Sequence, residues 1–269
     1  MHKLQEIREA FRKQQPLIHC ITNPISINQC ANGILAIGAR PMMAEHPAEV
    51  QEITETADAL MLNLGNITDA RMQSMKIALQ TAKERNIPVI LDAVGIACSK
   101  LRRDYLAELL TIGIPTVIKG NYSEIYALHH AAHRSSGVDA DATLNVDSIS
   151  AAAAELARKY HTTILASGKV DIVTDGTRIV HVKNGTPQLS TVTGTGCLLG
   201  ALCAAYLSVC TDMNAAITAC LVLGVCGQIA ETPRGSGSFM VNLMDELSTL
   251  TAAQLDHYKD MEELQHEDN

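Results

Sequence analysis

The sequence predicts an α/β fold with a mostly parallel central sheet and helices on both of its faces. Apolar, β-branched runs alternate with helical patterns along most of the chain, which is typical of parallel strands joined by helical crossovers. The chain has 269 residues, of which 47% are hydrophobic, and this is enough to bury one large core. Because no stretch has the composition of a linker, we expect one domain over residues 1–269.

The N-terminal segment begins this alternation. Leu4, Ile7 and Phe11 recur at helical spacing and predict a helix that ends before Pro16. Residues 17–20 are a short apolar run that predicts the first strand.

A second helix and strand follow at once. Asn23 next to Pro24 predicts a helix start, with Asn23 as the N-cap and Pro24 at the first helical position. The apolar run 27–37 forms the body of this helix, and Gly38 ends it before a strand over residues 40–44. Small residues inside the helix would let another backbone or a ligand approach closely: Ala31, Gly33 and Ala36.

The same order continues through the rest of the chain. Helices are predicted over residues 47–57, 66–85, 100–112, 121–133, 146–160 and 213–230, and from residue 238 to the C-terminus. Strands are predicted over residues 59–63, 87–91, 116–118 and 163–166. Asp175 and Gly176 lie between two β-branched runs and predict a hairpin, which would add antiparallel strands to the sheet. Residues 135–143 are polar and predict a surface loop.

Charge and cysteine content exclude several classes of function. The formal net charge is −8, so no basic surface is available for nucleic acid or for anionic lipid. The N-terminus lacks an apolar signal core and no apolar run is long enough to span a membrane, so we expect a soluble cytoplasmic protein. The eight cysteines include no C-x-x-C pair, which disfavours zinc and thioredoxin-like chemistry.

The segment 191–206, TVTGTGCLLGALCAAY, is the strongest functional signal in the chain. Gly194, Thr195, Gly196 and Cys197 come directly before a long apolar helical pattern. The first amides of a helix have no intrahelical partner and its dipole favours negative charge, so this turn can hold a phosphate. A thiol there can lose its proton more readily than a free one. The competing interpretation is a plain strand–turn–helix junction with a buried small residue.

Polar residues at predicted strand ends point to one site. Asn63, Asp92 and Lys119 lie at or just beyond the ends of three strands, where parallel sheets gather their ligands, and we expect them to face Cys197. A carboxylate such as Asp92 can hold Mg²⁺, but it can also cap the next turn.

Glu124 follows Asn121 by three residues, a spacing that can aim a carboxylate at a metal-bound phosphate. An amide and an acid in a first helical turn are also ordinary helix-start residues, so both interpretations stay open.

Two further patterns are weaker. Ser167-Gly168-Lys169, after a predicted strand, can touch a nucleotide phosphate or form a simple turn. His129 and His133 are four residues apart and can bind a metal, although near a helix C-terminus they also complement the dipole. The Walker pattern and a strand-initial G-x-G-x-x-G are both missing, which argues against ordinary P-loop and dinucleotide-binding proteins.

Five segments, in order along nearly the whole chain, together closely resemble the hydroxyethylthiazole kinases, thiamin-salvage enzymes of the ribokinase-like superfamily. They are PLIHCITNPISINQCANGILAIGARPMMAE (16–45), LNLGNI (62–67), ILDAVG (90–95), VIKGNYSEI (117–125) and VTGTGCLLGAL (192–202). The first block is specific to this family within the superfamily, whereas the last glycine motif is shared more widely.

The resemblance implies a ribokinase-like three-layer sandwich. It also implies ATP-dependent phosphorylation of the primary hydroxyl of 4-methyl-5-(2-hydroxyethyl)thiazole with Mg²⁺, and a homotrimer with sites between subunits. Residue by residue, the expected site falls into four groups. The catalytic residues are Gly194, Thr195, Gly196 and Cys197, and the substrate-binding residues are Met43, Gly194 and Asn23. The ATP-binding residues are Lys119, Ser167 and Asn23, and the metal-binding residues are Asp92 and Glu124. Cys197 occupies the position where the wider superfamily carries an aspartate base.

Three positions depart from the family pattern. Lys119 stands where Arg is usual, which loses bidentate phosphate geometry but keeps a positive charge. Ser167-Gly168-Lys169 stands where relatives often have T-G-E, and Ala93 stands where Pro is usual.

These departures keep two alternatives open. One is a kinase for another small alcohol such as hydroxymethylpyrimidine, and the other is a non-catalytic binder of thiazole or nucleotide.

Overall fold

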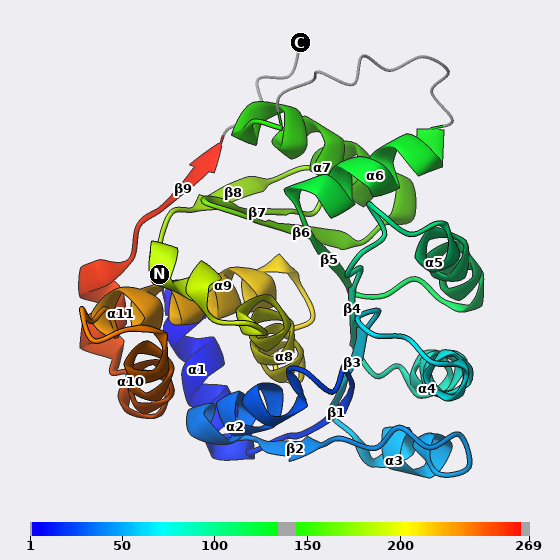
Figure 1. Cartoon of the computed structure of the whole chain (residues 1–269), viewed down its shortest axis with the longest axis horizontal. Coiled ribbons are helices and arrows are strands. Elements are labelled where there is room, and N and C mark those ends of the chain that lie inside the picture. Colours follow the sequence, from blue (N-terminus) through cyan, green and yellow to red (C-terminus); the bar gives the residue numbers. More distant parts are fainter. Residues whose placement is uncertain (1, 134–143, 265–269) are drawn as a thin grey trace.

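The computed structural model describes residues 2–133 and 144–264, and it forms three layers (Figure 1). A nine-stranded sheet in the order β2-β1-β3-β4-β5-β6-β7-β8-β9 crosses these described residues, with helices on both faces. This arrangement confirms the predicted α/β fold class.

The strands divide into a parallel group and an antiparallel edge. The parallel group consists of β1 (Leu17–Ile21), β2 (Arg40–Met42), β3 (Ala59–Asn63), β4 (Val89–Asp92), β5 (Val117–Asn121) and β6 (Thr163–Ser167). The antiparallel edge consists of β7 (Asp171–Thr174), β8 (Ile179–Val182) and β9 (Met261–Leu264). The predicted hairpin around Asp175 and Gly176 is therefore confirmed.

The helices cover the sheet in two groups (Figure 1). One face carries α3 (Val50–Thr56), α4 (Asp69–Arg85), α5 (Lys100–Ile112), α6 (Tyr122–His133) and α7 (Val146–Tyr160). The other face carries α1 (His2–Gln14), α2 (Ile27–Ile37), α8 (Thr195–Leu207), α9 (Met213–Ile229), α10 (Ser236–Thr249) and α11 (Ala252–Tyr258). A short 3₁₀ helix, η1 (Pro187–Thr191), leads into α8.

Alternating side chains of the central strands feed two apolar cores. Along β3, Ala59 and Met61 pack into the core under α8 and α9, whereas Leu60 and Leu62 pack into the core under α4 to α7. All four side chains are fully buried. A strand that is covered on both faces has apolar residues throughout and does not alternate between apolar and polar residues. Residues 59–62 are therefore one continuous apolar run in the sequence.

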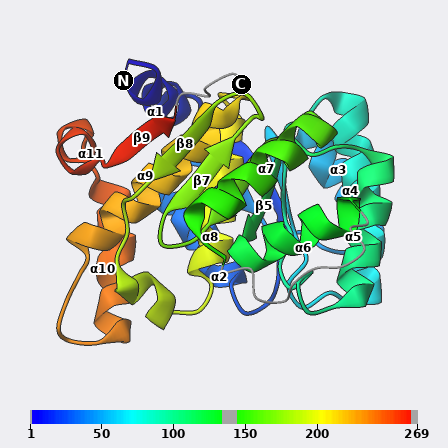
Figure 2. The same ribbon diagram turned by 90° about the horizontal axis from the view of Figure 1, so that it is seen from above.

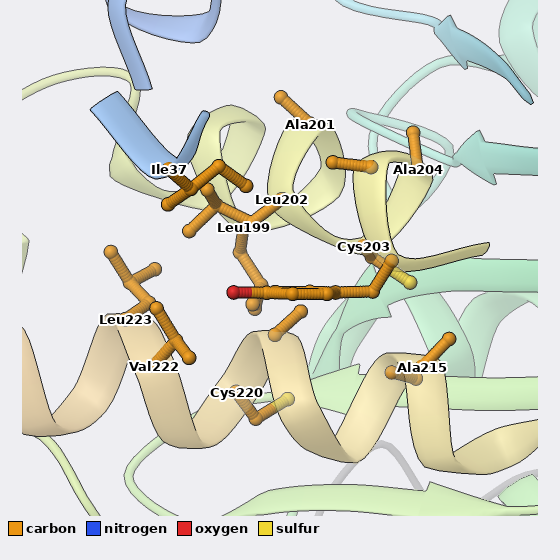
Figure 3. Packing of buried hydrophobic residues seen from close by; sticks show 14 of the residues in the cluster. Ile37, Leu199, Ala201, Leu202, Cys203, Ala204, Ala215, Cys220, Val222 and Leu223 are labelled. Carbon is orange, nitrogen blue, oxygen red and sulfur yellow. The ribbon is translucent and has the colours of Figure 1, made fainter. Parts of the chain in front are cut away.

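Small side chains let α8 and α9 pack closely against each other beneath the sheet. Leu199 and Cys203 on α8 face Cys220 and Val222 on α9 across this contact (Figure 3). Both helices are buried nearly all round, so they are apolar on every side. Alanine and cysteine thus supply much of this core in a chain with only 3% aromatic residues.

Two local predictions are wrong. The second helix begins at Ile27 with Ser26 as its N-cap, and Pro24 lies in the turn before it. Asn23 does not cap this helix: its side-chain oxygen instead accepts hydrogen bonds from the backbone amides of Ile25 and Ser26, at 3.1 Å each.

The C-terminal segment is the second correction. In place of one helix to the C-terminus there are two, α10 and α11, which are interrupted at residues 250–251; α11 ends at Tyr258, and β9 then pairs with β8 at the edge of the sheet (Figure 2). The predicted surface loop at residues 135–143 lies outside the described residues. Across the described ranges, no helix is long and apolar enough to cross a membrane.

Candidate active site

Three buried polar side chains meet at the carboxyl ends of neighbouring strands. Asn63 ends β3, Asp92 ends β4, and Lys119 lies beside Asp92 on β5, in direct register with it. Lys119 Nζ lies 3.0 Å from Asp92 Oδ1, and Asn63 Nδ2 donates to Asp92 Oδ2 at 3.0 Å. The predicted meeting of these residues is therefore confirmed. The parallel direction of β3, β4 and β5 causes it, since it brings the carboxyl ends of these strands to one edge.

Cys197 lies in the first turn of α8 and faces the same cluster. Its Sγ atom accepts two hydrogen bonds at 3.3 Å, one from Asn23 Nδ2 and one from Asn63 Nδ2. The side chain is half-buried. The thiol thus joins the N-terminus of α8 to the ends of β1 and β3.

Gly194 shapes the turn that starts α8. Its φ of +86° lies in the left-handed region, where glycine carries no steric penalty. A side chain here would also meet α2, because a Cβ would lie 3.0 Å from Ser26 Cβ. The first bond of the helix runs from the Leu198 amide to the Gly194 carbonyl at 2.8 Å. The preceding amides, of residues 195–197, are left without an intrahelical acceptor and are available to an anion.

Lys119 adds a positive charge to this helix N-terminus. A Cβ placed on Gly196 would lie 3.9 Å from Lys119 Nζ, so the ammonium group faces the turn. The Thr195 hydroxyl points elsewhere and donates to the Leu189 carbonyl at 2.9 Å. Of the predicted GTGC residues, Thr195 thus offers this turn its backbone amide and not its side chain.

Burial and charge set the ionisation of the Lys119–Asp92 pair. Burial raises the pKa of Asp92 to about 6, against the lowering effect of Lys119, and Glu124 raises it further. Burial lowers the pKa of Lys119, but Asp92 outweighs this effect and holds the Lys119 pKa above its ordinary value. The pair is therefore ionised at neutral pH, and Asp92 is the group that protonates first as the pH falls.

Glu124 is held at the start of α6 by backbone amides. Its Oε1 accepts from the Gly95 amide and its Oε2 from the Asn121 amide, both at 2.7 Å. Asn121 Oδ1 in turn accepts from the Glu124 amide at 2.9 Å. This reciprocal arrangement is a capping box, so the helix-start interpretation of N-x-x-E is correct, and each carboxylate oxygen keeps a second lone pair for another ligand.

The carboxylates of Asp92 and Glu124 are hard oxygen donors of the kind that Mg²⁺ prefers. Within the described ranges, no group of three or more His, Cys, Asp or Glu side chains could enclose a metal. Mg²⁺ is commonly held by one or two carboxylates together with substrate phosphates and water. The donor set therefore suits Mg²⁺ and does not form a cage for a resident metal.

Ser167 ends β6, in register with Asn121, and its hydroxyl contacts the Gly120 carbonyl at 3.4 Å. The Tyr122 ring covers the next residue, since a Cβ on Gly168 would lie 2.6 Å from the ring. Ser167 thus lies at the carboxyl end of β6, next to β5, and the Tyr122 ring packs against the turn that follows β6. Tyr122 was not predicted, although its position directly after KGN was a signal.

Other predicted residues lie outside the hydrogen-bonded cluster. Met43 is half-buried just beyond β2, at the same edge of the sheet, and packs against the same core as Cys197 does. Lys169 is exposed. His129 Nε2 lies 2.7 Å from Glu155 Oε2 on α7, so an acid partner exists that the sequence did not indicate, while the side chain of His133 is outside the described residues.

The family model described as the hydroxyethylthiazole kinase family matches residues 8–253. The chain belongs to the hydroxyethylthiazole kinase family. It is 43% identical over 251 residues to "Hydroxyethylthiazole kinase 2" of Clostridium botulinum, a match that covers 91% of this chain and 95% of that protein.

Solved structures agree with this family assignment. The structure of a hydroxyethylthiazole kinase from Pyrococcus horikoshii superposes with a TM-score of 0.91 and 33% identity, over 98% of this chain and 100% of that one. A ribokinase-like superfamily protein from Enterococcus faecalis superposes with a TM-score of 0.65 over 94% of both chains. At 14% identity, this second likeness shows the ribokinase-like fold alone.

Proposed function

We propose that this member of the hydroxyethylthiazole kinase family transfers the γ-phosphoryl group of ATP to the primary hydroxyl of 4-methyl-5-(2-hydroxyethyl)thiazole. The carrying observation is the buried Lys119–Asp92 pair, which faces the free amides at the N-terminus of α8. Phosphoryl transfer needs positioning and charge stabilisation more than covalent chemistry, and this arrangement supplies both.

The amides of Gly194, Thr195, Gly196 and Cys197 serve as the cradle for the transferring phosphoryl group. They combine unpaired N–H donors with the positive end of the helix dipole. Lys119 lies beside this cradle and offsets the charge of the phosphates. In its thiolate form, Cys197 would accept the alcohol proton and become the neutral thiol, but a loose transition state demands little activation of the alcohol.

The thiazole alcohol binds between Gly194 and Met43, with Asn23 at its edge. Ser26 Oγ and Gln29 Oε1 are buried next to Gly194 and, among the described residues, have no hydrogen-bond partner. Buried polar atoms in this state favour a polar ligand, because leaving them unpaired costs free energy. The substrate hydroxyl is a suitable partner.

ATP lies along the ends of β5 and β6. Lys119, Asn23 and Ser167 approach its phosphates, and the exposed Lys169 replaces the acid that relatives often carry. Asp92 and Glu124 would hold Mg²⁺, which would offset the negative charge of the phosphates. Because the carboxylate of Glu124 is fixed by two backbone amides, it needs no rearrangement to meet the ion.

The active assembly is a homotrimer with the substrate site near a subunit boundary. Apolar side chains are exposed in the turn before α2, on α2 and on β2, and a neighbouring subunit would cover them: Ile25, Leu35 and Met42 are 57%, 56% and 38% exposed. Sedimentation of the purified protein should give three times the chain mass, and a monomer would rule this assembly out. A cytoplasmic location fits the ATP requirement and the eight free cysteines, which survive reduced in that compartment.

Competition between two alcohols tests the substrate assignment. Purified protein receives ATP, Mg²⁺ and equal amounts of the thiazole alcohol and hydroxymethylpyrimidine, and the phosphorylated products are separated by mass. We expect the thiazole phosphate to dominate. Dominance of the pyrimidine phosphate would reassign the substrate, and binding of the thiazole alcohol without any product would identify a non-catalytic binder.

A further inference from the structure

Asn63 lies at the centre of the active-site cluster, and every hydrogen-bonding position of its side chain is in use. Its Nδ2 donates to Asp92 Oδ2 at 3.0 Å and to Cys197 Sγ at 3.3 Å. Its Oδ1 accepts from the Gly65 amide at 2.8 Å and from Asn23 Nδ2 at 3.2 Å. A carboxamide has two donor hydrogens and two acceptor lone pairs, so this fully buried side chain is saturated.

Backbone amides fix which way the two asparagines point. The Gly65 amide can only donate, so it must face the oxygen of Asn63 and not its nitrogen. The oxygen of Asn23 likewise accepts from the amides of Ile25 and Ser26. Both Nδ2 groups therefore point inward, and a flip of either amide would set N–H against N–H.

Packing leaves these carboxamides no room to turn away. A Cβ placed on Gly65 would lie 2.8 Å from both Asn63 Oδ1 and Asn23 Nδ2. The chain thus needs glycine at this position so that the backbone can approach the two side chains. The turn after β3 locks Asn63 against Asp92 and Cys197.

We propose that Asn63 is a positioning residue for phosphoryl transfer, whose two N–H groups hold the Asp92 carboxylate and the Cys197 thiol in one fixed arrangement beside the α8 N-terminus. This inference rests on the proposed function. Asp92 belongs to the group that meets the metal and phosphates, whereas Cys197 borders the alcohol. Asn63 is the side chain that donates to both, so it sets the spacing between donor and acceptor substrates.

The same contacts tune the reactivity of Cys197. Two N–H donors stabilise a negatively charged sulfur relative to a neutral one. The other ionisable groups around this thiol are Lys119 on β5, Cys30 on α2 and, beyond them, Asp92 and Glu124. Loss of the Asn63 donor therefore takes one of the two hydrogen bonds from the Cys197 sulfur without changing Cys197 itself.

Substitution Asn63→Asp tests the proposal because it keeps the shape and the oxygen that accepts the Gly65 amide, but removes both N–H donors. We expect kcat to fall about 100-fold, as for a small misplacement of reacting groups, while KM for ATP and for the alcohol stays within about threefold. A purely structural role would not separate kcat from KM in this way.

A second readout needs no kinase activity. Iodoacetamide alkylation is measured for each cysteine by peptide mass spectrometry, with the exposed Cys98 as the internal reference. In Asn63→Asp, the ratio of Cys197 to Cys98 alkylation should fall about tenfold, the effect of one lost hydrogen bond to a charged group. If the wild type proves not to be a kinase, this ratio still tests the role of Asn63.

Asn184→Asp is the matched control. Asn184 is also buried; its Nδ2 donates to Gln228 Oε1 at 2.7 Å and to the Tyr258 carbonyl at 2.8 Å, and its Oδ1 accepts from the Asp260 amide at 2.7 Å. The substitution removes the same two donors away from the active site. We expect its kcat and its Cys197 alkylation ratio to match the wild type.

Asn63→Ser is the second variant, since its hydroxyl can still accept the Gly65 amide and adds no charge. It should lose kcat and Cys197 reactivity as Asn63→Asp does. Wild-type kcat in either folded Asn63 variant, or an equal kcat loss in Asn184→Asp, would overturn the proposal. Failure of both Asn63 variants to fold would assign the residue to fold stability and overturn it too.

Discussion

At the scale of single residues, the site is a chain of hydrogen bonds from Asn23 through Asn63 to Asp92 and Lys119, with Cys197 bound to both asparagines. Each member is oriented by backbone groups or by its neighbour. Such a network is worth more than its separate bonds, because a half-satisfied member would leave a buried polar group unpaired. Reactive groups held in this way meet a substrate without reorganisation.

The role of Cys197 is open to direct measurement. In Cys197→Ser, the hydroxyl oxygen can accept the same two amide hydrogen bonds, so we expect kcat within about tenfold of wild type, a smaller loss than the roughly 100-fold or more that follows removal of a general base. Cys197→Asp should retain or raise kcat, since a carboxylate accepts the alcohol proton. A complete loss in both variants, with folding intact, would show that the thiol itself is required.

The Lys119–Asp92 pair predicts a pH dependence. Asp92 must be ionised to act, so kcat/KM should fall as the pH decreases through about 6, the raised pKa of this buried carboxyl. In Lys119→Met the lowering effect of the ammonium is lost, while burial and Glu124 still raise the pKa. The acid limb of the kcat/KM profile should therefore move to higher pH. An acid limb that stays in place, or moves to lower pH, would contradict this account of the pair.

Most of the site could be predicted from strand ends and the glycine turn. Asn63, Asp92 and Lys119 each follow an apolar run, and parallel topology then brings them together. The helix-capping role of Asn23 was predicted incorrectly, because an Asn-Pro pair can start either a helix or the turn before one. Here the side chain of Asn23 is held in the turn by the amides of Ile25 and Ser26 and by its contact with Asn63, which is 40 residues away in the sequence. The acid partner of His129 was missed for a comparable reason, since Glu155 lies on another helix.

At the scale of elements, α2 positions the start of α8. Gly33 on α2 leaves the space that Leu198 on α8 fills, since a Cβ on Gly33 would lie 2.2 Å from Leu198 Cδ1. The sequence indicated a close approach to this helix, and the approaching group is the side chain next to Cys197. Packing between α2 and α8 thus fixes where the phosphate cradle sits.

This contact predicts the cost of filling Gly33. Gly33→Val should destabilise the protein by about 1–3 kcal/mol, because an overpacked interior forces Leu198 to shift. Asn32→Val, at an exposed position one residue earlier, should change stability by less than about 0.5 kcal/mol. Chemical denaturation measures both. Equal stabilities of the two variants would mean that Leu198 can move aside for the larger side chain at no cost in stability.

The C-terminal strand β9 shows why the sequence pattern predicts only part of the fold. Residues 261–264, MEEL, have the composition of a helix, yet they form β9. Pairing with the open edge of β8 supplies backbone hydrogen bonds there, and ion pairs of Arg178 with Glu263 and of Lys183 with Glu262 add to it. Tertiary context therefore overrides local propensity.

At the scale of the whole molecule, one sheet separates two cores and carries the site at its centre. The core under α8 and α9 and the core under α4 to α7 receive alternate side chains of the same strands. We therefore propose one domain over residues 1–269. The antiparallel edge, β7 to β9, extends the sheet away from β3 and β4, where Asn63 and Asp92 lie.

Removal of β9 tests this separation of edge and site. A chain ending at residue 260 loses the pairing with β8, and we expect the melting temperature to fall by about 2–4 °C for each kcal/mol lost. The kcat should stay at the wild-type value because β3, β4, β5 and α8 are untouched. A large kcat loss at temperatures where the shortened protein is folded would show that the edge supports the site.

The most direct test compares phosphate transfer to the thiazole alcohol by the wild type and by Asp92→Asn, at saturating ATP and Mg²⁺, with circular dichroism as the check of folding. The wild type should form the thiazole phosphate. Asp92→Asn, which keeps the shape but loses the carboxylate between Lys119 and Asn63, should lose about 100-fold or more in kcat, as expected when a preorganised charge is removed. Absence of product with the wild type, or wild-type turnover by folded Asp92→Asn, would contradict the account.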